Sequence, residues 1–376
     1  MAARRLNAAL NEAGVKSSFY ALENSNFDLK AHEFAIKRTK FARILSGIVV
    51  RIQSKLSSKI LFSVISTRAI SNKQILALAQ TKNTVFHIHN WYNLLSESQI
   101  YEISRSGFPV VVTLHDQRLL TGGCHYTFEC NKFTSGCVAC PIIRKGFKRL
   151  PARVVRKREN QLSKTFQENS LTFISPSQWM RAESAKSKSS FGIPNVFIPN
   201  VLGPEFNKSC NSRAKSKDGK LRVGIASMDP TSYVKGGDVV SKLKSISRTD
   251  ENSFDLIFLT ELASLTEGIK AFWDQIDVLL VTSRADNSPN VIHEAHHFGV
   301  PVIATQVGGI SELLIDGFDY PISLDDMNPS FLSSRFDQIR NSMSTSGKSL
   351  PLNRGDLSQS KKAIEDYVNM CSQLFR

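Results

Sequence analysis

The sequence predicts an α/β protein made of two doubly wound domains, each with a parallel sheet covered by helices on both faces. Three observations support this fold class. The chain has 376 residues, which is more than one hydrophobic core usually accommodates. Apolar strand-like runs alternate with helical patterns along nearly the whole length. Residues 207–220, NKSCNSRAKSKDGK, are polar and basic and are interpreted as an interdomain linker or an exposed loop.

The expected strands are short apolar runs between the helical segments. They are residues 16–22, 84–89, 109–115, 171–175 and 196–200 in the first half, and 221–227, 254–260, 277–283 and 301–305 in the second. Residues 1–13 are predicted to form a helix that closes at Gly14. Because a doubly wound domain normally starts with a strand and a glycine-containing turn, we expect the first strand of the N-terminal domain to be missing from this chain.

The densest polar chemistry lies in SRADNSPNVIHEAHHFGVPVIAT, residues 283–305. This segment follows a predicted strand and continues as a helix whose first turn suits Pro289. Ligands of parallel sheets bind beyond the carboxyl ends of the strands, and the free amides at a helix start attract anions. The amides around residues 288–291 are thus placed for phosphate or sugar oxygens, and Asp286 and Glu294 for hydroxyl groups.

Two further glycine turns precede helix starts in the same half of the chain. Lys235, Gly236 and Gly237 follow the strand expected at 221–227, and QVGGISELL (306–314) follows the last expected strand. Taken singly, a Lys-Gly-Gly turn or a carboxylate at a helix start is usually structural. Three such turns in order along one alternation of strands and helices favour a site for a nucleotide diphosphate.

These segments together resemble the family 4 glycosyltransferases of the GT-B fold, in particular bacterial enzymes that build cell-surface polysaccharides. Asp286 and Glu294 match the two positions of that family's E-x7-E motif. EAHHFGVPVIATQVGGISELL is similar to its EA-x3-G-x-PV-x-A-x3-GG-x2-E run. SPSQWM (175–180) and FIPNVLGPEF (197–206) resemble two further segments of the family. The resemblance covers residues 1–320 with some ragged stretches, and a weaker C-terminal helix.

The resemblance implies two Rossmann-like domains that face a central cleft. An N-terminal acceptor-side domain would span residues 1–200, with a C-terminal helix at 360–376 packing back on it, and a nucleotide-sugar-binding domain would span 201–359. The implied activity is retaining glycosyl transfer from a nucleotide diphosphate sugar to a lipid-linked or growing surface polysaccharide, as in cell wall or lipopolysaccharide synthesis. No metal would be needed for the transfer. Two alternatives stay open: a nucleotide-sugar 2-epimerase of the same fold, and an N-terminally truncated homologue with weak or no activity.

The resemblance also implies roles for single residues of the second domain. Glu294 would bind the ribose of the nucleotide, Asp286 would bind the donor sugar as a catalytic residue, and Lys235 would neutralise the diphosphate. The implied donor-binding set is Lys235, Gly236, Asn290, Val291 and Glu294. The sequence departs from the family in two ways. Asp286 is one methylene shorter than the usual Glu, and GIASMDPTSYVKGG lacks the Arg that often precedes the Lys.

Histidines end two neighbouring predicted strands of the first half. A lone histidine is more often structural than catalytic, but His89 and His115 lie at the ends of parallel strands and Asp116 follows the second. His87 lies two residues before His89 in the same predicted strand and is expected to be buried. The resemblance implies that His115 and Asp116 lie near the donor sugar. We therefore expect His115 to be catalytic, and His89 and Asp116 to lie on the acceptor side.

Four of the six cysteines crowd into CHYTFECNKFTSGCVAC. Cys124, Cys130, Cys137 and Cys140 have the spacing C-x5-C-x6-C-x2-C, of which the last pair is typical of zinc ligands. The first pair is wider than usual, and His125 could replace a cysteine. Two alternatives stay open: a structural zinc, and a loop of reduced, buried thiols.

Charge indicates the kind of partner. The chain has 48 Lys and Arg against 33 Asp and Glu, a net charge of +15 that favours anionic partners. Residues 144–158, RKGFKRLPARVVRKR, contain eight basic residues, and residues 37–59 form a one-faced apolar stripe flanked by Lys and Arg. A basic amphipathic helix can lie on an anionic membrane surface; the alternative is a helix packed on its own sheet. No nucleic acid is expected, because the basic stretches lack stacking aromatics and known binding motifs.

Location follows from the apolar runs. None approaches the ~18 residues that a membrane-spanning helix needs, and the start MAARRLNAAL lacks the apolar centre of a signal peptide. We therefore expect a cytoplasmic protein that is peripheral on the inner face of the plasma membrane.

Overall fold

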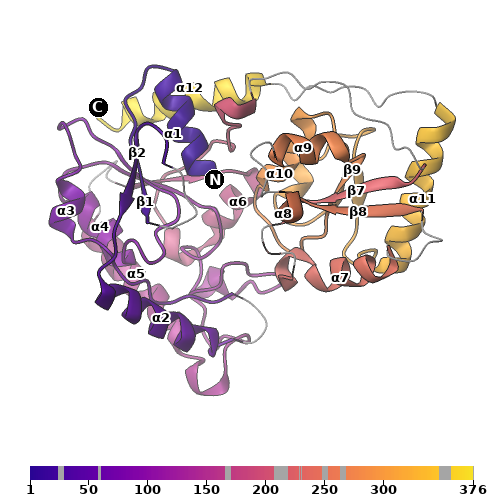
Figure 1. Cartoon of the computed structure of the whole chain (residues 1–376). Coiled ribbons are helices and arrows are strands. Elements are labelled where there is room, and N and C mark those ends of the chain that lie inside the picture. The colour runs from indigo at the N-terminus through magenta and orange to yellow at the C-terminus, as the bar shows by residue number, and fades with distance from the viewer. Residues whose placement is uncertain are drawn as a thin grey trace. The chain divides into compact units, whose positions relative to one another are not determined.

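The computed structural model describes residues 1–375 except 24–28, 58–60, 166–170, 207–218, 228, 230, 248–252, 263–267 and 347–356. By its contacts the chain divides into two units (Figure 1). Unit 1 consists of Met1–Gly203 and Ser360–Arg376, and unit 2 of Pro204–Gln359. The sequence placed this boundary at 200/201. Most of the predicted linker, residues 207–218, lies outside the described residues.

Unit 1 is built on a four-stranded parallel sheet. Its strand order is β3-β4-β5-β6, with β3 at Phe86–Ile88, β4 at Val110–Thr113, β5 at Leu171–Ser175 and β6 at Asn195–Phe197. Two further strands, β1 (Phe19–Leu22) and β2 (Glu33–Ile36), pair with each other in a separate parallel sheet. All four residues of β4 are buried, as expected of a central strand covered on both faces.

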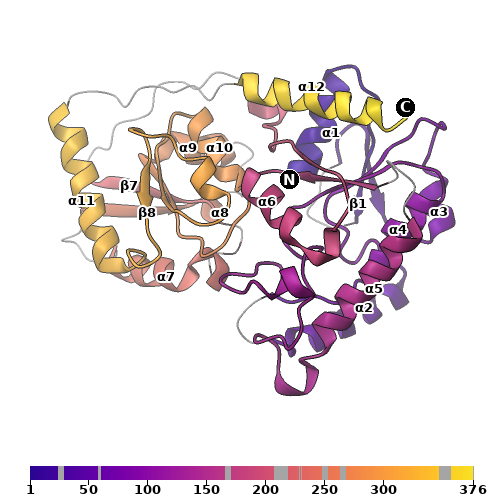
Figure 2. The same cartoon turned by 180° about the vertical axis from the view of Figure 1, so that it is seen from behind.

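Helices cover the sheets of unit 1, and the first and last helices of the chain, α1 and α12, lie side by side (Figures 1 and 2). Ala9 and Leu10 of the first helix pack with Val111 of β4 and with Ala363 and Tyr367 of the last helix, which thereby joins unit 1. The helices are α1 (Ala2–Glu12), α2 (Lys40–Ser54), α3 (Asn72–Leu76), α4 (Glu97–Arg105), α5 (Leu150–Thr165), α6 (Gln178–Lys186) and α12 (Leu357–Gln373), with 3-10 turns η1 (Lys132–Ser135), η2 (Lys145–Phe147) and η3 (Lys188–Ser190).

Unit 2 is a five-stranded parallel sheet in the order β11-β10-β9-β7-β8. Val223, Val278 and Ile303 from its three inner strands form a core with Leu332 and Phe336. The strands are β7 (Leu221–Ile225), β8 (Phe254–Phe258), β9 (Val278–Val281), β10 (Val302–Thr305) and β11 (Tyr320–Ile322). The helices are α7 (Gly237–Ile246), α8 (Leu259–Leu262), α9 (Gly268–Gln275), α10 (Asn290–His297) and α11 (Pro329–Ser346), with 3-10 turns η4 (Pro204–Phe206), η5 (Tyr233–Lys235) and η6 (Ile310–Glu312).

The predicted α/β class with parallel sheets is confirmed. Each of the nine expected strand segments overlaps a strand, although β6 begins one residue before the expected 196–200 and ends at Phe197, and residues 1–13 contain α1. Two strands were not predicted. β2 (EFAI) and β11 (YPI) are three or four residues long and each includes an outward-facing residue, so neither forms a recognisable apolar run. In the described chain α1 is the first element, and the missing first strand stays a prediction.

Candidate functional site

A glycine-dependent turn positions Lys235 at the carboxyl edge of the unit 2 sheet. Gly236 has φ of +73°, and a Cβ at this residue would lie 2.2 Å from the carbonyl oxygen of Thr282, just after β9. Such a contact is too close for any side chain, so only glycine lets the two segments approach. The Thr282 hydroxyl donates to the carbonyl of Lys235 (2.9 Å), and the Arg284 N–H donates to that of Val234 (2.7 Å).

Lys235 and Asp286 form an ion pair at this edge. The Lys235 ammonium donates to Asp286 Oδ2 over 2.5 Å, and the Asn287 N–H donates to Asp286 Oδ1 over 2.9 Å. Asp286 is 6% exposed, whereas the Lys235 side chain keeps 37% of its surface exposed. The buried Asp286 carboxylate is therefore held by the Asn287 N–H and the Lys235 ammonium. The ammonium itself lies at the surface, where an anion can reach it.

The third glycine turn joins the same site. The Gly309 N–H donates to the carbonyl of Asp286 over 3.2 Å, and the Thr305 hydroxyl at the end of β10 donates to the carbonyl of Ser283. The loops after β7, β9 and β10 are thus linked through the segment around Asp286. This is the convergence of loops that parallel strands produce at their carboxyl ends.

The remaining predicted donor-binding residues lie on α10. Asn290 is the first residue of this helix and Val291 the second, and both are partly exposed. Pro289, expected inside the first turn, is the N-cap residue just before it. Glu294 lies one turn further and is 4% exposed. The helix therefore starts four residues after Asp286, within the segment in which the sequence predicts a helix start.

Arg284 is a cation of this site that the sequence did not single out. Its guanidinium donates to Asp238 (2.7 and 2.9 Å) and lies 4.0 Å from the ring centroid of Tyr233. This pairing, chiefly the hydrogen bond, lowers the pKa of Asp238. Arg284 thus braces the turn that carries Lys235. The sequence signal that could have identified Arg284 as a site residue is its position two residues before Asp286, in the segment SRADN.

Three histidines cluster at the strand ends of unit 1. His89 Nδ1 lies 2.9 Å from His115 Nε2, and the rings of His87 and His89 are 4.1 Å apart. His87 Nε2 bonds the Thr113 hydroxyl (2.7 Å), and its ring stacks on Tyr367 of α12. Burial holds the pKa of His115 at about 4 and that of His87 at about 3, and it also lowers the pKa of His89. All three are therefore neutral near pH 7, so that one nitrogen of the His89–His115 pair donates and the other accepts.

Asp116 points into the following loop. Its carboxylate lies 3.0 Å from His125 Nδ1 and accepts the Arg118 N–H over 2.8 Å. These hydrogen bonds and the Arg118 charge lower the pKa of Asp116, although burial acts in the opposite direction. Asp116 thus holds the start of the cysteine-containing loop, whereas His115 contacts His89.

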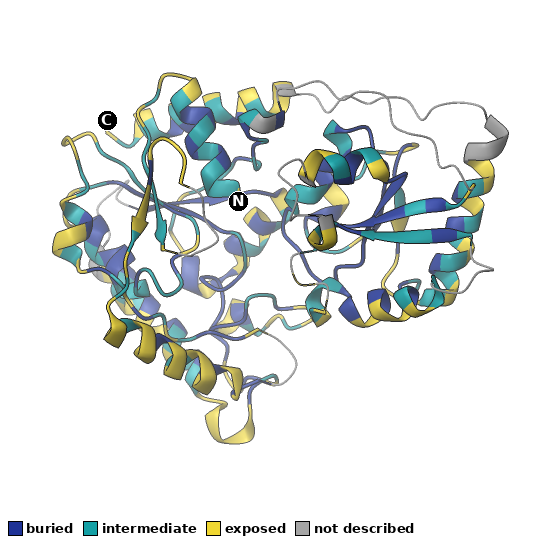
Figure 3. Cartoon of the chain, viewed as in Figure 1, coloured by how far each residue is buried: buried dark blue, intermediate teal, exposed yellow. Residues whose placement is uncertain are grey.

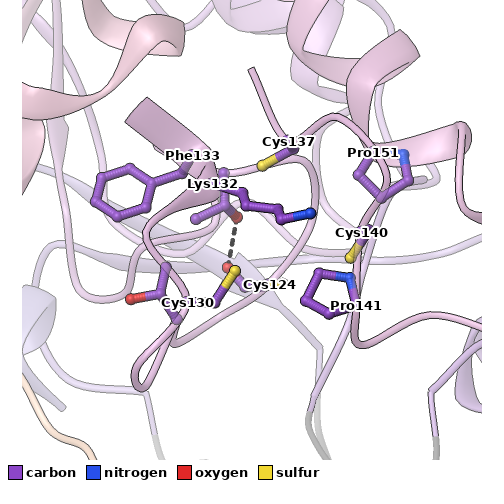
Figure 4. Close-up of a pocket in the computed structure, with 10 residues that line it drawn as sticks. Cys124, Cys130, Lys132, Phe133, Cys137, Cys140, Pro141 and Pro151 are labelled. Atoms are coloured by element: carbon purple, nitrogen blue, oxygen red, sulfur yellow. Dashed lines mark hydrogen bonds between the residues drawn. The ribbon is translucent and has the colours of Figure 1, made fainter. Parts of the chain in front are cut away.

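The four clustered cysteines line one pocket, together with Lys132 and Pro151 (Figure 4). Cys124, Cys137 and Cys140 are buried and Cys130 is partly exposed, and all four are free thiols. The Gly122 N–H donates to Cys137 Sγ over 3.3 Å. His125, the predicted substitute ligand, instead contacts Asp116 and Ser63. Within the described residues, no group of three or more His, Cys, Asp or Glu side chains is arranged to hold a metal ion.

Comparisons with known proteins agree with this architecture. Residues 227–333, which contain Lys235, Asp286 and Glu294, match the family model for glycosyl transferases group 1. The chain is 26% identical over 258 residues to the putative colanic acid biosynthesis glycosyl transferase WcaC of Escherichia coli (strain K12), covering 61% of this chain and 62% of that protein. The matched region thus spans less than two thirds of this relative.

Solved structures show the same fold. Sucrose-phosphate synthase from Thermosynechococcus elongatus has a TM-score of 0.55 at 13% identity, over 99% of this chain and 90% of its own. A glycosyltransferase from Rickettsia africae has a TM-score of 0.51 at 10% identity, over 100% of this chain and 94% of its own. At such identities the likeness shows the fold alone.

The fold and these matches define a class. The chain has the GT-B fold with two Rossmann-like units, and the expected resemblance to the family 4 glycosyltransferases is confirmed.

Proposed function

We propose that this protein is a retaining glycosyltransferase that moves a sugar from a nucleotide diphosphate sugar to a lipid-linked or growing surface polysaccharide. The observation that carries the proposal is the Lys235–Asp286 pair at the carboxyl edge of the unit 2 sheet, inside the segment that matches the glycosyl transferase model. The name of the E. coli relative, which refers to colanic acid biosynthesis, supports a polysaccharide product.

The donor would bind at Lys235 and at the start of α10. The diphosphate would accept hydrogen bonds from the Lys235 ammonium and from amides near Asn290 and Val291, and the ribose would bond Glu294. Transfer breaks the bond between the anomeric carbon and the phosphate oxygen, while an acceptor hydroxyl oxygen forms the new bond to that carbon and its proton passes to the departing diphosphate. Because negative charge grows on the departing diphosphate, Lys235 would stabilise the transition state more than the bound donor.

The histidine cluster of unit 1 would serve the transferred sugar and the acceptor. Neutral His115 and His89 can each donate and accept one hydrogen bond without bringing a charge. We infer that His115 orients the reacting groups. His115→Ala should therefore lower kcat about 100-fold, the scale of a positioned polar group, and leave nucleotide affinity within a factor of two; equal losses in both would contradict this role.

The test begins with a thermal-shift screen against nucleotides and nucleotide sugars, because a bound ligand raises the unfolding temperature. The expected result is a rise with one nucleoside diphosphate and its sugar, lost in Lys235→Met. The donor so identified is then incubated with and without glycan acceptors. A new glycoside in the presence of acceptor supports transfer. A changed sugar nucleotide from donor alone identifies a 2-epimerase, and binding without turnover identifies an inactive homologue.

We also propose that the cysteine loop holds a structural zinc that takes no part in transfer. The four thiols share one pocket, and Cys137 and Ala139 have φ of 57° and 50°, a backbone that only a constrained turn retains. The Lys132 ammonium donates to the Ala139 carbonyl (3.0 Å) and lies between the cysteines, where it would offset part of the negative charge of four thiolates (Figure 4). The side chains would rotate toward the ion when it binds.

A lipid-linked acceptor implies a working position at a membrane. In the described part of the chain no helix has the length and apolar character to cross a bilayer. We propose instead that the protein is peripheral on the inner face of the plasma membrane. The structural basis for such contact lies in unit 1.

A further inference from the structure

Helix α2 turns its apolar side outward. Ser46 and Gln53 are its buried residues. At 100° per residue, five apolar side chains form one stripe on a different side of the helix. This stripe is between 41% and 75% exposed. We call it the α2 stripe; it consists of Phe41, Ile44, Leu45, Ile48 and Ile52.

A polar side chain attaches α2 to its unit. The Gln53 side-chain oxygen accepts the N–H groups of Val64 (2.5 Å) and Ile65 (2.7 Å). Its amide donates to the Ile65 carbonyl (3.0 Å) and to the Tyr92 hydroxyl (3.1 Å). Four hydrogen bonds therefore hold the helix by its polar side. The alternative that the apolar side of α2 packs on the protein's own sheet is wrong for the five residues of the α2 stripe, because they are exposed; Leu56, just after the helix, is buried.

Basic side chains flank the α2 stripe. Residues 37–59 contain no Asp or Glu. Lys40, Arg51 and Lys55 are all exposed, and at 100° per residue they fall along one side of the stripe. Such a combination of apolar and basic side chains is typical of helices that lie in the interface of an anionic bilayer.

The second basic stretch meets the end of α2. The Arg144 N–H donates to the carbonyl of Leu56 over 3.1 Å, so the loop that follows begins beside the helix. Phe147 in this loop is 51% exposed. Its basic residues Lys145, Lys148 and Arg149 are exposed as well. Figure 3 shows α2 and this loop as exposed segments of unit 1.

One residue of the basic stretch does not belong to this surface. Arg158 is 2% exposed and donates to Glu97 Oε1 over 2.5 Å. Of the predicted membrane-binding stretch 144–158, the N-terminal part that begins at Arg144 is the part linked to the end of α2 by a hydrogen bond.

We propose that α2 and residues 144–149 form a single membrane-binding surface, in which the α2 stripe inserts between the headgroups of an anionic bilayer and the basic side chains contact lipid phosphates. Insertion would remove the stripe from water, which is the driving force that exposed apolar side chains retain. This inference gives the proposed transferase its membrane partner, but its test requires no transferase activity.

The test measures binding of the full chain to vesicles of phosphatidylcholine with or without phosphatidylglycerol. We expect binding to the anionic vesicles, weak binding to the neutral ones, and weakening as salt increases. Since each basic side chain near the surface contributes about a fivefold gain in binding, Lys40→Gln with Arg51→Gln should weaken it roughly 20-fold. Ile48→Glu should weaken it more than about tenfold.

The matched control is Val50→Glu. Val50 is 41% exposed on the same helix, yet it lies opposite Phe41 and outside the α2 stripe. This variant adds the same charge and should bind within a factor of two of the unaltered chain. Circular dichroism and the donor thermal shift show that each variant is folded, and the latter also separates failure of this inference from failure of the proposed function.

Depth of insertion provides a second measurement. In Ile48→Trp the new indole should be quenched by brominated lipid acyl chains, whereas in Val50→Trp quenching should not exceed that of the unaltered chain with its three Trp. Equal binding of Ile48→Glu and Val50→Glu, or equal binding to neutral and anionic vesicles, would overturn the proposal. Absence of vesicle binding would also overturn it if the unaltered chain instead forms a concentration-dependent dimer, or a complex with random duplex DNA, and Ile48→Glu disrupts that dimer or complex.

Discussion

At the scale of single residues, Gly236 decides whether Lys235 can reach its place. A methyl group at residue 236 would collide with the Thr282 carbonyl. The backbone there is also left-handed, with φ of +73°, a conformation that residues with a side chain rarely adopt. We expect Gly236→Ala to lower the free energy of unfolding by about 2 kcal/mol and to weaken donor binding, as measured by urea titration and thermal shift.

Gly47 offers the matched control for this substitution. It lies within α2, has no atom within 4 Å of an added Cβ and has no positive φ. Gly47→Ala should leave stability unchanged or raise it by up to about 1 kcal/mol. If both variants lose the same stability, the close approach of the two segments is not what glycine serves at residue 236.

Asp286 holds the Lys235 ammonium in the structure, yet it is proposed to bind the donor sugar. These two roles predict different effects of Asp286→Asn on nucleotide affinity and on turnover. Asp286→Asn removes the charge that competes with the diphosphate for Lys235, so nucleoside diphosphate affinity should stay the same or rise in calorimetry. Turnover should fall about 100-fold or more, the scale of losing one electrostatic contact to the transition state. A large loss of nucleotide affinity with unchanged turnover would contradict this division.

At the scale of elements, α2 shows the limit of what periodicity indicates. The spacing of its apolar residues predicts an amphipathic helix, and Lys40–Ser54 is that helix. Periodicity does not state which side is buried. Gln53 decides this, because it reaches backbone groups of residues 64 and 65 that the fold brings beside it. Such a long-range contact leaves no trace in local spacing.

The cysteine loop is a second element whose sequence pattern and structure differ in what they specify. The spacing leaves a structural zinc and a loop of reduced thiols as alternatives; the structure brings all four cysteines to one pocket as free thiols, but within the described residues they are not arranged to hold a metal ion. Burial and then the neighbouring thiols raise the pKa of Cys124, so zinc would have to displace protons on binding. A structural zinc therefore stays a prediction with a direct test.

We expect purified protein to contain about one zinc per chain, as four thiolates would require, measured by elemental analysis. Cobalt substitution should give the absorption of a tetrahedral tetrathiolate site. Cys137→Ser should lower both metal signals and the unfolding temperature, whereas Cys371→Ser, a cysteine in α12 far from the loop in sequence, should leave both metal signals unchanged. Protein without zinc or iron that keeps its stability would exclude the site.

At the scale of the whole molecule, the last helix completes the first unit. Tyr367 of α12 stacks on His87 at 5.2 Å, and His87 bonds Thr113 at the end of β4. The C-terminal segment thereby closes the cluster of neutral histidines from one side. Because these rings are buried in the uncharged form, their protonation opposes folding.

A pH dependence of stability follows. The pKa of His115 is about 4 in the folded chain and that of His87 about 3, whereas unfolded histidine has a pKa of ~6.5. Between these values the unfolded chain binds more protons, so stability is complete above pH ~6.5 and decreases toward pH ~4. Each histidine should contribute up to about 1.4 kcal/mol per pH unit. Urea titrations between pH 5 and 7 measure this slope, which His89→Gln should reduce; an unchanged slope would contradict the buried cluster.

The sequence by itself determined the parallel α/β class, nearly all strands, the family resemblance and the order of the three turns around Lys235, Asp286 and Gly309. Strand periodicity and glycine turns are local, so they can be recognised in one chain. Only the tertiary structure decided that Asp286 pairs with Lys235, that the Asp116 carboxylate contacts His125 of the cysteine loop, and that the α2 stripe faces outward. These outcomes depend on contacts between residues distant in sequence, whose choice is made by packing and burial rather than by local pattern.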